Sequence, residues 1–254
     1  MRMCKICEDT EFKCRIHEVL TPFYYPVKNI DAYAHHFGYV YKNNKELQDH
    51  SRRNISLLKE EVKERPDDMR LAAQLLQEYK VLGEYEKILE YASMLIKECD
   101  CGEIKKKLEK EIIAKWRGIF YAHIIDAYEK KCDYDEVLKI IQKTYEYDMV
   151  NEITEAFCAR SSLIANYEKK NYLEAMEAFN KYIKLYKILN EDDEKLLFQG
   201  PLFIGSVVAA KEYRLMLIYG IMVAAKLENI EIIEKYIQEI EFDDKRRYLH
   251  SEFV

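Results

Sequence analysis

The sequence predicts a mainly α-helical protein in which hairpins of two helices stack on one another, preceded by a short β-hairpin segment. Apolar residues make up 49% of the 254 residues, enough for a continuous buried core. Glycine (7) and proline (4) are scarce, which favours long helices with short connections. Apolar residues recur with a helical period over 44–254, but not over 1–43. We therefore expect two parts that divide there.

Extended character dominates the first part. The runs MRMCKI and FKCRIHEVL flank the polar stretch EDTE. Short apolar runs on either side of a polar turn indicate two antiparallel strands. A third short extended run is expected near AYAHHFGYV. The segment 1–43 is too short to bury a core of its own, so we expect it to pack on the first helix around Leu47, Ile55 and Leu58.

Helices are predicted for most of the second part. The first begins at Lys45 and ends before Pro66, and Asp67 or Asp68 can cap the next one through its carboxylate. The further predicted helices span 67–82, 84–98, 102–130, 134–147, 151–169, 172–189, 206–227 and 229–240.

One pattern recurs along these helices. An apolar helix is followed by a short turn, and in most of the repeats an aromatic residue opens the next helix. The marker residues are Tyr79, Gly83, Tyr85 and Ile88, then Tyr128, Cys132, Tyr134 and Val137, then Tyr172, Ala175 and Phe179, and finally Ile230, Ile233 and Ile237. This pattern resembles the tetratricopeptide repeat, although Ile88 and Val137 stand where that family prefers alanine. The resemblance implies an α–α superhelix, because each hairpin must stack on its neighbours to bury its apolar face.

A second resemblance lies in the first 95 residues. The motifs that carry it are the runs RMCK (2–5), FKCRIHE (12–18), HHFGY (35–39), RNISLL (53–58) and PDD (66–68). In this order and spacing they resemble the end of the catalytic domain of bacterial family 2 glycosyltransferases, with departures at Cys4, Lys5 and Cys14. The resemblance implies sugar transfer from a nucleotide donor with a divalent metal. It also implies that His17 and Glu18 are catalytic and that His36 lies on the acceptor or metal side.

The donor half of such an enzyme is not expected in this chain. In the family, the nucleotide-binding domain and its Asp-x-Asp metal motif precede these motifs. The sequence has neither a βαβ unit nor a glycine-rich turn that could hold a diphosphate. Asp133-Tyr134-Asp135 has the Asp-x-Asp pattern, but it stands between two predicted helices, where Asp133 would be a cap. We expect the chain alone to be inactive and to hold no cofactor.

The seven cysteines are expected to be free thiols. Their number is odd, and several fall inside predicted helices. Cys4-x-x-Cys7 and Cys14-x-x-His17 have spacings found in zinc sites, but residues three apart on a strand point to opposite faces. We therefore favour a hairpin without zinc. Near Cys99 and Cys101, Asp100 is expected to cap the following helix.

Charge excludes some partners. The net charge is −6, the pI is about 5.7, and the basic residues are not clustered, so non-specific binding to nucleic acid is not expected. No uncharged apolar run is long enough to span a membrane, and Glu8, Asp9 and Glu11 stand where a signal peptide would be apolar. We therefore expect a cytoplasmic location.

A binding groove is expected on the inner face of the first helix of each hairpin. On that face lie Gln77, Lys80, Asp126 and Glu129, a set of mixed charge. Two functions follow. In the first, the chain is the helical module of a family 2 glycosyltransferase-like protein and binds a protein partner or positions the acceptor. In the second, it is a free-standing scaffold that binds a partner protein or peptide.

Overall fold

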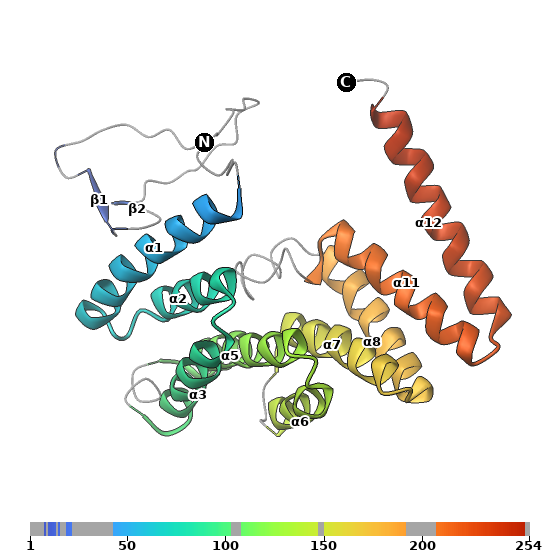
Figure 1. Cartoon of the computed structure of the whole chain (residues 1–254), viewed down its shortest axis with the longest axis horizontal. Helices are drawn as coiled ribbons and strands as arrows, with labels where there is room; N and C mark the ends of the chain where they lie inside the picture. The colour runs from blue at the N-terminus through green and yellow to red at the C-terminus, as the bar shows by residue number, and fades with distance from the viewer. Residues whose placement is uncertain are drawn as a thin grey trace. The chain divides into compact units, whose positions relative to one another are not determined.

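The computed structural model describes residues 8, 10–13, 15, 19–21, 43–102, 108–146, 150–191 and 207–251. This part of the chain is mainly helical, as predicted (Figure 1). Its helices are α1 (Asn44–Glu64), α2 (Met69–Leu82), α3 (Tyr85–Cys101), α5 (Lys110–Lys130), α6 (Tyr134–Tyr145), α7 (Glu152–Glu168), α8 (Tyr172–Asn190), α11 (Ala210–Lys226) and α12 (Ile230–Ser251). None of these helices has the length and apolar character of a membrane span. Contacts divide the chain into two compact units, Met1–Glu84 and Tyr85–Val254.

Most predicted helices are confirmed to within a few residues, and two boundaries were wrong. The helix predicted from residue 102 begins at Lys110, since Gly102 follows the end of α3 and Glu109 has an extended backbone (φ −68°, ψ 154°). Asp100 was expected to cap this helix, but it lies within α3 and pairs with Arg117 of α5 at 3.5 Å. The last helix continues past residue 240 to Ser251, because no glycine or proline interrupts it.

In the first unit, α1 packs against α2. Ile55 and Leu58 of α1 are buried, as their helical spacing predicts. Asn54 is also buried, and its Nδ2 donates to Glu78 Oε1 of α2 at 2.7 Å. The motif run 53–58 therefore supplies both the apolar and the polar contacts of this helix pair.

Two short strands belong to the same unit. Strand β1 (Glu11–Lys13) pairs antiparallel with β2 (Val19–Thr21), so that Phe12 lies opposite Leu20. The run FKCRIHEVL was predicted as one strand, but it contributes to both of these strands instead. The partner strand predicted over 1–6 lies outside the described residues.

Four turns share one backbone conformation. Gly83, Cys132, Lys170 and Glu228 have φ values of 71°, 57°, 64° and 56°. In each turn, the next N–H donates to the carbonyl of the residue five positions earlier, at 2.8–3.0 Å, as in Glu84 to Tyr79 and Asn171 to Asn166. This is the Schellman ending of a helix, in which a left-handed residue satisfies the last carbonyls. The predicted hairpin turns are thus confirmed at the level of the backbone.

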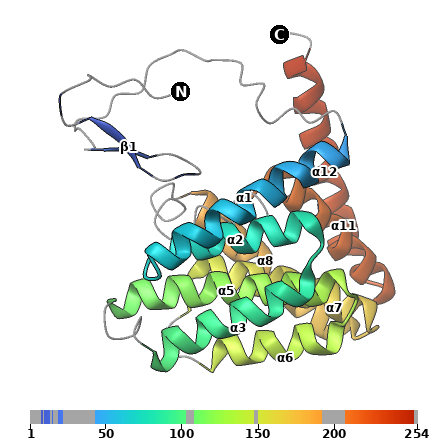
Figure 2. The ribbon, with the colours of Figure 1, turned by 60° about the vertical axis from the view of Figure 1, so that its left-hand side comes forward.

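In the second unit, α5 and α7 are the central helices. Helix α5 contacts α3, α6 and α7, and α7 contacts α6, α8 and α11 (Figure 2). Both helices are buried on nearly all sides, including His123 of α5. Helices α5, α7 and α11 are thus the first helices of three successive hairpins, and α7 contacts both of the others. Helices α6, α8 and α12 are the second helices of these hairpins.

Phe179, Ala175 and Tyr172 of the third hairpin were predicted to be buried, which is confirmed for the first two and wrong for Tyr172. Phe179 and Ala175 of α8 are fully buried, while Tyr172 is half-buried against Tyr167. The Phe179 ring meets Tyr236 of α12 edge to face at 5.0 Å. Of the marker residues of α12, Ile230 and Ile237 are 67% and 42% exposed, whereas Tyr236 is buried.

Candidate functional site

The predicted site residues fall into three groups. His17, Glu18 and His36 lie outside the described residues. Gln77 and Lys80 belong to α2 in the first unit. Asp126 and Glu129 belong to α5 in the second unit. The two helical pairs therefore belong to different units.

Gln77 and Lys80 share one face of α2. They are three residues apart, so their side chains are neighbours on the helix, and both are half-buried. Leu76 and Tyr79 of this turn are buried, and half-buried Glu78 accepts from Asn54 of α1. Gln77 and Lys80 are thus partly exposed polar side chains on a face of α2 that differs from the face used for packing.

Glu129 takes part in a buried charge cluster with Arg160 and Glu212. Arg160 of α7 donates from Nη1 to both oxygens of Glu129 of α5 at 2.5 Å, and from Nε to Glu212 Oε1 of α11 at 2.6 Å. The three side chains are only 10–18% exposed. One guanidinium therefore joins the first helices of three successive hairpins, and the cluster keeps one excess negative charge.

Electrostatics explain why this cluster is charged in spite of its burial. Burial alone lowers the pKa of Arg160, but Glu129 and Glu212 outweigh this effect and raise it above its usual value. Charge-assisted hydrogen bonds of this kind are roughly twice as strong as those between neutral groups. The cluster is therefore a fixed polar crosslink between α5, α7 and α11.

Asp126 lies one turn before Glu129 on α5 and is buried, with 7% exposure. Glu129 is occupied by Arg160. The two residues thus belong to the polar interior of the second unit, and a direct contact with a partner stays a prediction. Sequence reasoning missed Arg160 and Glu212, although a charge within the apolar run of α7 indicates a buried partner.

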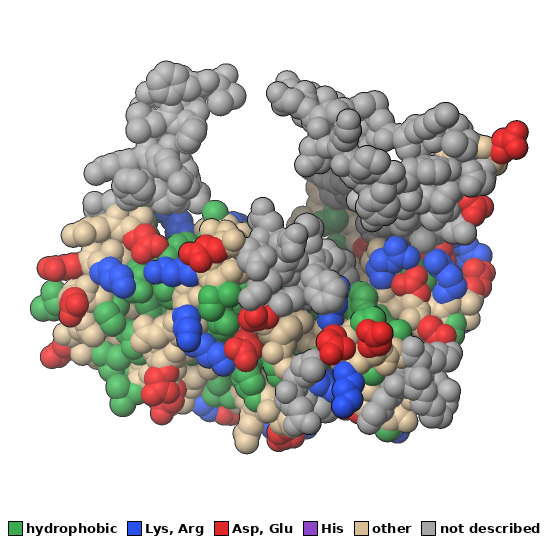
Figure 3. All heavy atoms as spheres, turned by 180° about the vertical axis from the view of Figure 1, so that it is seen from behind, with side chains coloured by type: hydrophobic (Ala, Val, Ile, Leu, Met, Phe, Trp, Pro, Cys, Tyr) green, Lys and Arg blue, Asp and Glu red, His purple; other side chains and the backbone are tan. Residues whose placement is uncertain are grey.

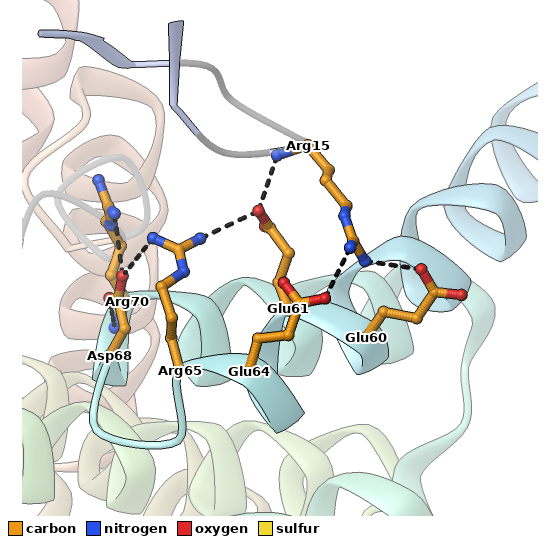
Figure 4. A network of polar contacts seen from close by, with 7 residues as sticks. All are labelled: Arg15, Glu60, Glu61, Glu64, Arg65, Asp68 and Arg70. Carbon is orange, nitrogen blue, oxygen red and sulfur yellow. Dashed lines mark hydrogen bonds and ion pairs between the residues drawn. The ribbon is translucent and has the colours of Figure 1, made fainter.

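A second polar cluster holds Arg15 on helix α1 (Figure 4). The Arg15 backbone N–H donates to Glu61 Oε1 at 2.7 Å, and its guanidinium donates to Glu60 at 2.6 Å and Glu64 at 2.7 Å. Arg65 also donates to Glu61 Oε1, at 3.0 Å. The segment at Arg15 is thus held at the C-terminal end of α1, beyond the residues around which packing was expected.

Glu61 is the centre of this cluster, which we name the Arg15 clamp and which comprises Arg15, Glu60, Glu61 and Glu64. Glu61 is 3% exposed, whereas Glu60 and Glu64 have side chains 60% and 58% exposed. Glu61 Oε2 is buried and has no hydrogen-bond partner among the described residues. A backbone contact to a buried carboxylate fixes the chain at Arg15 more firmly than the two solvated ion pairs do.

The carboxylates of the Asp-x-Asp run are used in the structure of the second unit. Asp133 caps α6 by accepting the Glu136 N–H at 3.3 Å, and Asp135 pairs with Lys169, so both carboxylates have structural partners. No group of three or more histidine, cysteine, aspartate or glutamate side chains suited to a metal occurs in the described ranges. Cys4, Cys7, Cys14 and His17 lie outside those ranges, so the expectation about zinc stays a prediction.

The described cysteines, Cys99, Cys101, Cys132 and Cys158, are free thiols, as expected.

Charged side chains of both signs are interspersed on the face seen in Figure 3.

Comparison of the chain with protein-family models, curated proteins and solved structures gave no match.

Proposed function

We propose that this chain is the tetratricopeptide-like helical module of a family 2 glycosyltransferase-like protein in the cytoplasm, and that it binds a protein partner or positions the acceptor. In this proposal the chain does not bind the nucleotide sugar itself and needs no metal of its own. His17 and Glu18 would supply one edge of a transfer site, with His36 on the acceptor or metal side.

The Arg160 cluster is the observation that carries this proposal. It joins α5, α7 and α11 through side chains from three hairpins, and each of these side chains is largely buried. Such a crosslink holds the first helices in a fixed arrangement before any partner binds. A prearranged surface loses less conformational entropy on binding, which favours a role in recognition.

The Arg15 clamp favours a link between the transferase-like segment and the helical module. Arg15 lies within the run FKCRIHE, and its three acceptors lie on the helix that contains the run RNISLL. Both runs belong to the resemblance to family 2 glycosyltransferases. Their contact supports a role for α1 in positioning the segment that contains His17 and Glu18.

The alternative is a free-standing scaffold that binds a protein or peptide. The two proposals share the binding face and differ in the ligand. An array of oligosaccharides and capped peptides, probed with the labelled chain, separates them. Saturable binding to oligosaccharides supports acceptor positioning, and binding to peptides alone supports the scaffold.

Variants on α2 connect the array to the predicted face. Lys80→Glu reverses an accessible charge and should reduce the array signal by about tenfold if Lys80 contacts the ligand. Lys63→Glu on α1 makes the same change at an exposed position outside the predicted groove and is the matched control. An absence of binding to either ligand class, or equal effects of both variants, would argue against the proposed groove.

A further inference from the structure

The second unit contains a pocket between helices α6, α7 and α8. Its volume is about 260 Å³. This lies below the roughly 300–1,000 Å³ of sites for drug-sized ligands, so its size suits a single side chain. The lining residues are Ile141, Tyr145, Cys158, Ala159, Ser162, Asn166, Glu174, Glu177, Ala178 and Lys181.

Small and apolar groups form one part of this lining. Ile141, Ala159 and Ala178 are buried core residues from three different helices. Cys158 is also buried, and burial raises the pKa of its thiol to about 12, so it stays a neutral, unreactive group. This part of the pocket can receive a hydrocarbon chain but offers no charge to a ligand.

Two carboxylates without partners form the other part. Glu174 and Glu177 are one turn apart on α8, both are exposed, and neither forms a hydrogen bond or ion pair with another described residue. Buried Asn166 and half-buried Ser162 lie on α7 beside them, and Asn166 Nδ2 donates to Ser162 Oγ at 3.1 Å. Asn166 Oδ1 already accepts from Asn171 at 3.3 Å, so Glu174 and Glu177 supply the free acceptor oxygens among these residues.

Lys181 does not neutralise these carboxylates. Its ammonium donates to Tyr145 Oη at 3.0 Å, lies 4.5 Å from the centre of the Tyr145 ring, and pairs with Glu155 at 3.7 Å. The charged lining residues Glu174, Glu177 and Lys181 carry a net charge of −1, and Glu155, which pairs with Lys181 from outside the lining, adds a further negative charge. A cationic ligand matches this charge.

We propose that this pocket binds an arginine side chain of a partner peptide. The inference rests on the proposed function as a protein-binding module and names the chemistry of the partner. The aliphatic part of arginine would lie against Ile141, Ala159 and Ala178. Its planar guanidinium would donate to Glu174 and Glu177 together, since five donors in a fixed plane match two carboxylates better than a single ammonium does.

The test uses the whole chain labelled with ¹⁵N and two capped amino acids as probes. N-acetyl-arginine N-methylamide should shift the amide signals of 158–166 and 174–181 in a saturable way. N-acetyl-citrulline N-methylamide has nearly the same shape without the charge, and it should leave these signals unchanged. Equal shifts with both probes, or none at these residues, would overturn the proposal.

Variants identify the groups involved. Glu174→Gln and Glu177→Gln keep the side-chain shape at exposed positions, and each should weaken arginine binding by about tenfold. Glu90→Gln, an exposed position on α3 outside the pocket, should have no effect. Lys181→Met should strengthen binding, since it removes a like charge from the lining.

Other outcomes distinguish a failure of the inference from a failure of the proposed function. Capped lysine binding as tightly as arginine would overturn the choice of a guanidinium, and N-acetylglucosamine shifting the same amides instead would overturn a peptide as the occupant. Array peptides that bind the chain equally well with and without arginine would show a peptide-binding module whose specificity lies elsewhere. If no peptide binds but capped arginine does, the pocket stands and the protein-binding function fails.

Discussion

The Cα atom of Gly220 lies directly against the ring of Phe179. A Cβ built on Gly220 of α11 would stand 2.4 Å from two carbons of the fully buried Phe179 ring of α8. The absence of a side chain at position 220 therefore allows α11 to approach α8. The same ring packs on Tyr236, so this contact connects the third and fourth hairpins.

Replacing Gly220 with alanine should destabilise the protein by about 1–3 kcal/mol, the range for added volume in a packed core. Urea unfolding would measure this change. Phe179→Ala alone should destabilise by about 3–5 kcal/mol, since it removes a buried ring. In the double variant the two effects should not add, because the shortened side chain makes room for the new methyl group. Additive effects would mean that the two residues do not meet.

The left-handed residue Lys170 offers a test of the repeated turn. A residue with a side chain at positive φ is strained by about 1–2 kcal/mol, part of which is offset because glycine loses more backbone entropy on folding. We therefore expect Lys170→Gly to raise the free energy of unfolding by up to about 1 kcal/mol. Lys184→Gly, in the exposed interior of α8, should lower it by about 1 kcal/mol. A loss of stability with both variants would contradict the turn geometry.

The charge cluster on α7 predicts a pH-dependent defect. Arg160→Met leaves Glu129 and Glu212 buried without their cation, which should cost about 3–5 kcal/mol at neutral pH. In this variant the folded state favours protonated carboxylates, so it binds more protons than the unfolded state. Its stability relative to the original chain should therefore recover as the pH is lowered toward about 5. Unfolding by urea at several pH values measures this, and a defect independent of pH would contradict the cluster.

The Arg15 clamp should be weakened by salt and by mutation. Glu60→Gln combined with Glu64→Gln removes both solvated ion pairs from Arg15 without disturbing the core. Hydrogen exchange of 11–21, followed by mass spectrometry, should become faster in this variant, and high salt should have a similar effect in the original chain. Arg52→Ala, which removes an exposed pair with Asp49 within α1, is the control. Unchanged exchange would mean that the ion pairs do not hold the segment.

Helix positions and turns could be predicted from the sequence because they depend on local patterns. Apolar residues with a period of 3.6 marked the helices, and the spacing from Tyr128 to Tyr134 marked a turn that the structure contains. The start of α5 at Lys110 was missed, since residues 103–109 have helical composition without glycine or proline.

The polar contacts could not be predicted, because they join residues far apart in the sequence. Arg160 and Glu212 are separated by 52 positions, and Arg15 and Glu61 by 46. No periodicity connects such pairs. Glu129 was predicted to line the groove because it lies on the inner face of a first helix. In the structure, it instead pairs with Arg160 of the next hairpin.

Calorimetry with nucleotide sugars tests most directly the proposal that this chain does not bind a nucleotide sugar by itself. The chain is mixed with common uridine and guanosine diphosphate sugars and manganese. A transfer site must hold the donor diphosphate and its metal, and a helical module lacks the phosphate-binding turns that do this. We predict no heat beyond that of dilution. Micromolar binding that disappears in His17→Ala or Glu18→Ala would show that a complete donor site exists in this chain, and would contradict the account.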